Sequence, residues 1–108
     1  MVFEETVVLT GPFDDVVVAT KAALADHGFG VLTEIDMQHT LKTKVDKDMD
    51  RYVILGACTP NLASAALDVE PHVGVLLPCN VVVRQVDDTV HVDALAPGVM
   101  VSMTSRDE

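Results

Sequence analysis

The sequence contains no tryptophan, and aromatic residues of all kinds make up only 4% of its 108 positions. Hydrophobic residues nevertheless account for 49% of the chain, and valine dominates many of the apolar runs. The core must therefore be aliphatic, and its β-branched side chains favour strands. A chain of this length forms one domain and buries enough surface to fold without a metal or a disulfide.

Basic residues are also scarce, since 7 lysines and arginines stand against 17 aspartates and glutamates, for a formal net charge of −10. Nucleic-acid binding depends largely on basic side chains that neutralise phosphates. An anionic membrane surface would repel this chain for the same reason. The charge therefore excludes DNA, RNA and such membranes as expected partners, and it favours solubility.

Long hydrophobic runs are missing as well. No segment approaches the roughly 18–20 apolar residues that a membrane-spanning helix needs. The first residues lack the basic region that opens a signal peptide. We therefore expect a cytoplasmic protein without a membrane partner, in which the only two cysteines, Cys58 and Cys79, are reduced thiols.

The hydrophobic pattern predicts helices and strands that follow each other closely. The best-defined helix begins near Phe13, after Pro12, and ends before Gly28, which suits the left-handed position that follows a helix. Near the other end, two valine-rich strands joined at Asp87 and Asp88 form a predicted hairpin. The remaining predictions are strands at residues 3–9, 29–35 and 52–55 and helices at residues 37–46 and 60–68, with residues 72–77 left unassigned.

These elements predict an α+β fold. Within the strand at residues 29–35, the strand period of two places Phe29, Val31, Thr33 and Ile35 on one face. Helices beside strands that end in a hairpin indicate a compact two-layer α/β sandwich, with an antiparallel or mixed sheet and helices packed on one face. We expect a single domain over residues 1–108, with residues 102–108 as a frayed tail.

The common catalytic motifs are absent. The sequence has no Walker loop, no Gly-x-Ser-x-Gly, no His-Glu-x-x-His and no Cys-x-x-Cys. Gly28 and Gly30 resemble half of a dinucleotide fingerprint, but they follow a predicted helix, whereas that motif must precede one. The sequence therefore favours a binding or structural protein over an enzyme.

The two cysteines are the strongest candidates for chemistry. Cys58 stands where a strand ends and a helix begins, and the partial positive charge of a helix start favours a thiolate. Cys79, between Pro78 and Asn80, has a turn-like context. If the flanking strands are neighbours, both thiols lie at one end of the sheet. They could then share a metal, form a reversible disulfide or line one pocket. Alternatively, each cysteine packs as a small hydrophobic residue.

Two segments carry a resemblance to a known family. Residues 52–63 (YVILGACTPNLA) and 70–83 (EPHVGVLLPCNVVV) resemble the signature of the DUF302 family, a domain of unknown function, and the likeness extends from Phe3 to about Met100. The resemblance implies a compact α/β sandwich, often dimeric, without an established reaction. Thr59 departs from the family, which often has Asn there. The matching positions are Cys58, Pro60, Glu70, Pro71, Gly74, Pro78, Cys79 and Asn80.

From these positions we predict a ligand-binding site at the rim of the sheet, formed by Cys58, Cys79, Glu70 and Asn80. Alternatively, Glu70 is a solvated residue, or it ends a helix ahead of a proline. A small-molecule or metal ligand would suit two thiols, and a soft transition metal or haem is the expected cofactor class.

A metal site would need further ligands. Two cysteines do not complete a closed zinc site, so His72, His91 or a second subunit would have to contribute. The predicted metal set is Cys58, Cys79 and His72. Two other hypotheses stay open at this point. One is a thiol-based redox protein in which Cys79 resolves an oxidised Cys58. The other is a structural homodimer with buried cysteines that associates through an apolar sheet surface.

Overall fold

The structure is a computed structural model that describes residues 4–95, and it contains five strands, three α-helices and one 3-10 helix. Phe3 and the predicted tail at residues 102–108 lie outside the described residues. The elements in chain order are β1 (Glu4–Leu9), α1 (Phe13–Asp26), β2 (Gly30–Asp36), α2 (Met37–Val45), β3 (Tyr52–Cys58), α3 (Pro60–Val69), η1 (Pro71–Leu76), β4 (Cys79–Val86) and β5 (Thr89–Leu95).

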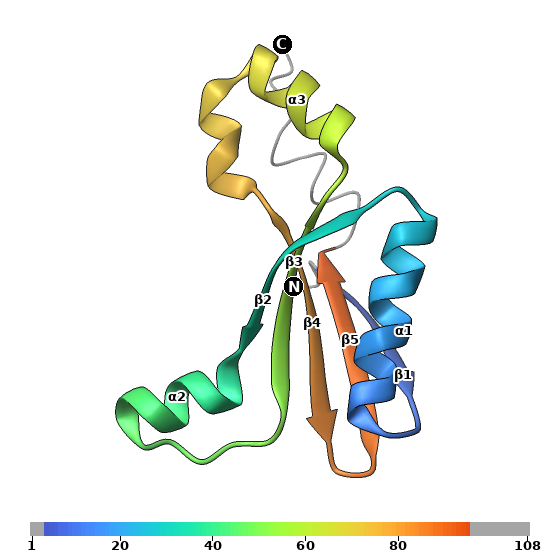
Figure 1. Ribbon diagram of the computed structural model, residues 1–108, viewed down its shortest axis with the longest axis vertical. Helices are drawn as coiled ribbons and strands as arrows, with labels where there is room; N and C mark the ends of the chain where they lie inside the picture. Colours follow the sequence, from blue (N-terminus) through green and yellow to red (C-terminus); the bar gives the residue numbers. More distant parts are fainter. Residues whose placement is uncertain (1–3, 96–108) are drawn as a thin grey trace.

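The five strands form one sheet in the order β1-β5-β4-β3-β2, and every neighbouring pair is antiparallel (Figure 1). The first strand of the chain thus pairs with the last described strand at one edge of the sheet. The predicted hairpin is confirmed as β4 and β5, joined at Asp87 and Asp88. The α+β class and the antiparallel sheet are therefore as expected from the sequence.

The core lies between α1 and one face of the sheet. Phe13, Val16 and Val17 of α1 are buried against alternate residues of the central strands, as a period of two requires. Leu55 and Val83 are fully buried. The other buried members of the cluster are Val53, Val81 and Val90. The core is aliphatic apart from Phe13, which confirms the inference from composition.

The alternation predicted for β2 is wrong. A register shift between Val31 and Thr33 breaks the pairing with β3. Val31 pairs with Ala57 and packs against the core, whereas Thr33 and Ile35 pair with residues of β3 that face away from α1. A bulge inserts one extra residue into a strand, and the period of two then continues on the other face.

The segment after β3 forms an arm, defined here as residues 60–76. It comprises α3 and the 3-10 helix η1, which occupies most of the segment left unassigned by the sequence pattern. The two helices pack against each other and project beyond the end of the sheet (Figure 1). Leu62, Val69 and Val75 of the arm are exposed. Val73 of the arm is buried, but it lies outside the main core cluster, whose buried helical residues all come from α1.

Candidate functional site

The structure places both cysteines at the same end of the sheet. Cys58 is the last residue of β3 and Cys79 is the first residue of β4, and these strands are antiparallel neighbours in which Ala57 pairs with Cys79. Both residues are free thiols with partly buried side chains. The flanking strands are therefore neighbours, which is the condition that a site shared by the two thiols requires.

The two side chains nevertheless leave the sheet on opposite sides. Cys79 shares a face with its partner Ala57, which is the face covered by α1. Cys58 follows Ala57 in the strand, so its side chain belongs to the other face. Burial raises the pKa of the Cys79 thiol above its ordinary value, and the charge of Cys58 raises it further. Cys79 is therefore held in its protonated form, which disfavours nucleophilic attack by this residue.

Glu70 and His72 are engaged with each other in the arm. The Glu70 carboxylate caps η1 by accepting a hydrogen bond of 3.0 Å from the backbone N–H of His72. The same oxygen lies 2.6 Å from Nδ1 of the His72 ring, whose side chain is 92% exposed. Glu70 is also the residue that ends α3 ahead of Pro71, in line with the alternative interpretation that it ends a helix.

The predicted metal ligands do not gather in one place. Across residues 4–95, no group of three or more His, Cys, Asp or Glu side chains is arranged to hold a metal ion. Cys58, Cys79 and His72 therefore do not form such a group within one chain. Asn80, the other predicted ligand, is exposed and pairs with Gly56 in the register of β3 and β4.

A polar network that sequence reasoning missed lies on the sheet face opposite α1. Arg84 Nε donates a hydrogen bond of 2.6 Å to one carboxylate oxygen of Asp93, and Thr6 Oγ1 donates one of 2.7 Å to the other. Arg84 Nη2 also lies 3.4 Å from His91 Nδ1. Burial opposes ionisation of Asp93, but the hydrogen bonds from Arg84 and Thr6 and the charge of Arg84 keep its pKa below the ordinary value. Asp93 is therefore ionised and paired.

Apolar side chains surround this network. We call the sheet face opposite α1 the open face. Val8 and Ile35 on it are 55% and 43% exposed, and Ile54 pairs with Val82 near its centre. The other residues placed there by the register are Thr6, Thr33, Tyr52, Gly56, Cys58, Asn80, Arg84, Val86, Thr89, His91 and Asp93. The open face thus combines aliphatic side chains with polar ones, and its ion pair is neutralised.

Comparisons with known proteins agree with this fold. The family model for "Domain of unknown function DUF302" matches residues 5–108. The crystal structure of an uncharacterized conserved DUF302 protein from Bacillus stearothermophilus superposes with a TM-score of 0.88. The two chains are 28% identical, and the similarity covers 99% of this chain and 84% of the other. No curated protein matches the sequence. Every helix in residues 4–95 is too short or too polar to cross a membrane.

Proposed function

Because the chain belongs to the DUF302 family, whose function is unknown, we propose that it acts as an interaction domain that assembles as a homodimer through the open face. The observation that carries this proposal is that Val8 and Ile35 are exposed on the side of the sheet opposite α1, beside the half-buried Ile54. Apolar side chains gathered on an exposed surface mark interaction sites in proteins. A sheet face also presents the flat surface that two identical copies can match about a twofold axis.

The charges on the open face also favour this face as the dimer interface. Two copies of a chain with a net charge of −10 repel each other, so a stable contact needs a surface without unpaired acidic groups. On the open face, Asp93 is paired with Arg84 and accepts a hydrogen bond from Thr6. The face can therefore be covered without leaving an isolated carboxylate, and Arg84 and Tyr52 are residue types that concentrate binding energy at interfaces.

Replacing Val82 with lysine tests the homodimer. Val82 pairs with Ile54 on one side and with Asp93 on the other, so a new charge there would be desolvated in the dimer. We expect the wild-type chain to sediment as a dimer at micromolar concentration, and Val82→Lys to weaken dimerisation by about tenfold or more. Sedimentation velocity over a concentration series measures this change.

The matched control is Val18→Lys, which places the same charge on the outer side of α1 at a residue that is 66% exposed. This variant should dimerise like the wild type, and circular dichroism should show that both variants are folded. A wild-type monomer over the whole concentration range would refute the proposal. If Val82→Lys and the wild type dimerised equally, the interface would lie elsewhere on the protein.

A second candidate function is ligand binding by the two thiols. It is favoured by the position of Cys58 and Cys79 on neighbouring strands, where the charge of one affects the pKa of the other. Since the thiols occupy opposite faces, a ligand that contacts both must sit at the end of the sheet. A soft transition metal or haem there would require ligands from a second copy, which is compatible with a dimer.

Intact-mass and elemental analysis of protein purified without exposure to affinity metals tests this second function. The expected result is one equivalent of a metal or cofactor per dimer, and loss of that equivalent in both Cys58→Ser and Cys79→Ser. If the wild-type protein carries neither group, or if both variants keep it, the thiols have no such role. The cysteines would then be packing residues of the interaction domain.

A further inference from the structure

His91 lies on the open face, within the polar network. It stands on β5, where it pairs with Arg84 of β4 on one side and with Val8 of β1 on the other. Its side chain is partly buried in the single chain. A dimer formed through the open face would therefore cover an imidazole, a group that exchanges its proton near neutral pH.

The contact between His91 and Arg84 depends on the protonation of the imidazole. Arg84 Nη2 lies 3.4 Å from His91 Nδ1. A guanidinium has N–H donors and no acceptor, so Nδ1 can accept a hydrogen bond from it only while this nitrogen carries no proton. Protonation of both ring nitrogens would turn donor against donor and place two positive charges side by side. The network is therefore arranged for the neutral form of His91.

The other groups that face His91 do not remove this conflict. Asp93, two residues further along β5, would attract a protonated imidazole, but both of its carboxylate oxygens are already engaged, one by Arg84 and the other by Thr6. Although burial opposes it, these hydrogen bonds keep the pKa of Asp93 below its ordinary value, so the carboxylate stays ionised at mildly acidic pH. On the β1 side, the neighbours Val8 and Thr6 are uncharged.

We propose that His91 makes the homodimer sensitive to pH, so that the dimer forms with neutral His91 and dissociates when His91 binds a proton. This inference rests on the proposed dimer through the open face. Burial in an interface removes water from an imidazole and disfavours its charged form, and the guanidinium of Arg84 acts in the same direction. Because separated chains bind the proton more easily than the dimer does, acid shifts the equilibrium toward the monomer.

The overall charge of the protein predicts the opposite response to acid. Each chain carries a net charge of −10, and the three histidines other than His91 are exposed. Their protonation would reduce the repulsion between two copies. If His91 had no role, the dimer would therefore become tighter as the pH falls. The sign of the pH effect distinguishes the two accounts.

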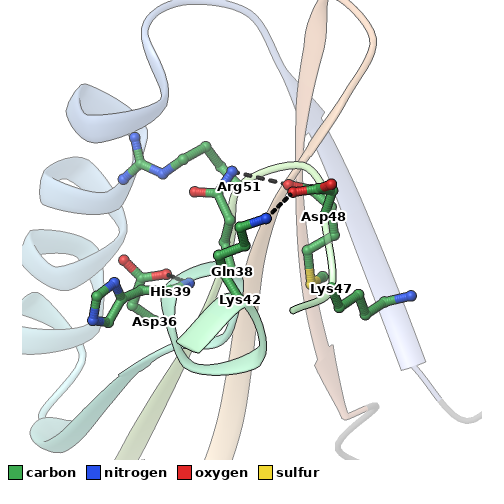
Figure 2. A pocket seen from close by; sticks show the side chains of 8 residues that line it. Asp36, Gln38, His39, Lys42, Lys47, Asp48 and Arg51 are labelled. Carbon is green, nitrogen blue, oxygen red and sulfur yellow. Dashed lines mark hydrogen bonds and ion pairs between the residues drawn. The ribbon is translucent and has the colours of Figure 1, made fainter. Parts of the chain in front are cut away.

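The other three histidines belong to elements outside the open face. His27 follows α1, which covers the opposite face of the sheet. His72 belongs to the arm. Figure 2 shows His39 of α2 at a hollow that is also lined by Arg51, which is bound to Asp14 of α1. Protonation of these histidines therefore changes the overall charge and not the charge of the open face.

Sedimentation velocity of the full chain at pH 7.5 and pH 5.5, at one ionic strength, tests the proposal. We expect dimerisation of the wild type to be about tenfold weaker at pH 5.5, because desolvation commonly changes the proton affinity of a group by that factor or more. His91→Gln and His91→Asn keep a neutral polar side chain at both pH values and should not show this weakening. Circular dichroism should show that every variant is folded at both pH values.

The matched control is His27→Gln, which removes the same titratable group on the α1 side and should keep the wild-type response. A wild-type monomer at pH 7.5 would refute the proposed function itself. A wild-type dimer that is equally tight or tighter at pH 5.5, or that unfolds as it dissociates, would overturn only the role of His91. An equal response of the wild type and both His91 variants would do the same.

A second measurement needs no variant. The ring signals of His91 in NMR spectra report its proton uptake, and by linkage this uptake should occur at lower pH at concentrations where the dimer prevails than at concentrations where the monomer prevails. Proton uptake that does not depend on protein concentration would contradict the proposal, even if the His91 variants failed to dimerise.

Discussion

Replacing Leu55 with alanine is expected to lower the free energy of unfolding by roughly 2–5 kcal/mol. Leu55 has no exposed surface and is among the largest fully buried side chains in residues 4–95. It stands at the centre of β3, on the face that packs against α1. Removal of its branched end leaves a cavity that the surrounding strands cannot close, since both neighbours of β3 hold it in register. Urea denaturation followed by circular dichroism measures the change.

Leu62→Ala is the control for this prediction. Leu62 is 69% exposed on α3, so its truncation should change stability by no more than about 0.5 kcal/mol. A domain of this size has roughly 5–15 kcal/mol of stability, so Leu55→Ala could leave part of the protein unfolded. Leu55→Met keeps the side-chain volume and should cost less than about 1.5 kcal/mol. Equal losses for the two alanine variants would mean that the core is not centred on Leu55.

Replacing Gly56 with alanine is expected to destabilise the protein by roughly 1–3 kcal/mol. Here the added methyl group overfills the available space, whereas Leu55→Ala leaves a cavity. A methyl group at this position would overlap Oγ1 of Thr33 on β2 and lie 2.8 Å from Cγ of Pro78. Both are side-chain atoms, but the Pro78 ring cannot rotate away and Thr33 is held in β2 by its pairing with Gly56. The variant should therefore shift the urea midpoint to lower concentration.

Gly74→Ala is the matched control, because a methyl group on Gly74 would meet no atom within 4 Å. Its stability should stay within about 0.5 kcal/mol of the wild type. Thr33→Ala in the Gly56→Ala background removes one of the two overlaps, so the double variant should recover part of the loss. Additive effects of the two substitutions would show that Thr33 and Gly56 are not in contact.

Part of the candidate thiol site could be predicted from the sequence. Cys58 precedes a Thr-Pro helix start, and α3 does begin at Pro60 with Thr59 as its N-cap. The side of the sheet on which each thiol lies could not be predicted, because it depends on which residue of β3 faces Cys79. The register pairs Cys79 with Ala57, and a shift of one residue would have placed both thiols on one face.

The polar network of the open face could not be predicted from the sequence either, because it too depends on which strands pair and in which register. His91 and Asp93 alternate with valines along β5, which is a signal that these two side chains share a face, and the register of the hairpin adds Arg84 opposite His91. Thr6 is distant in sequence and meets Asp93 only because β1 pairs with β5. A single sequence carries no local trace of such a contact.

The amino-acid sequence by itself determined the local elements: α1 between Pro12 and Gly28, the hairpin at Asp87 and Asp88, an aliphatic core and membership of a family through its motifs. These depend on backbone preferences and side-chain periods that act over a few neighbouring residues. Only the tertiary structure decided the strand order, the bulge in β2, the opposite orientation of the thiols and which residues share the open face. Those features follow from pairings between distant segments, whose register is set by how all the strands pack together.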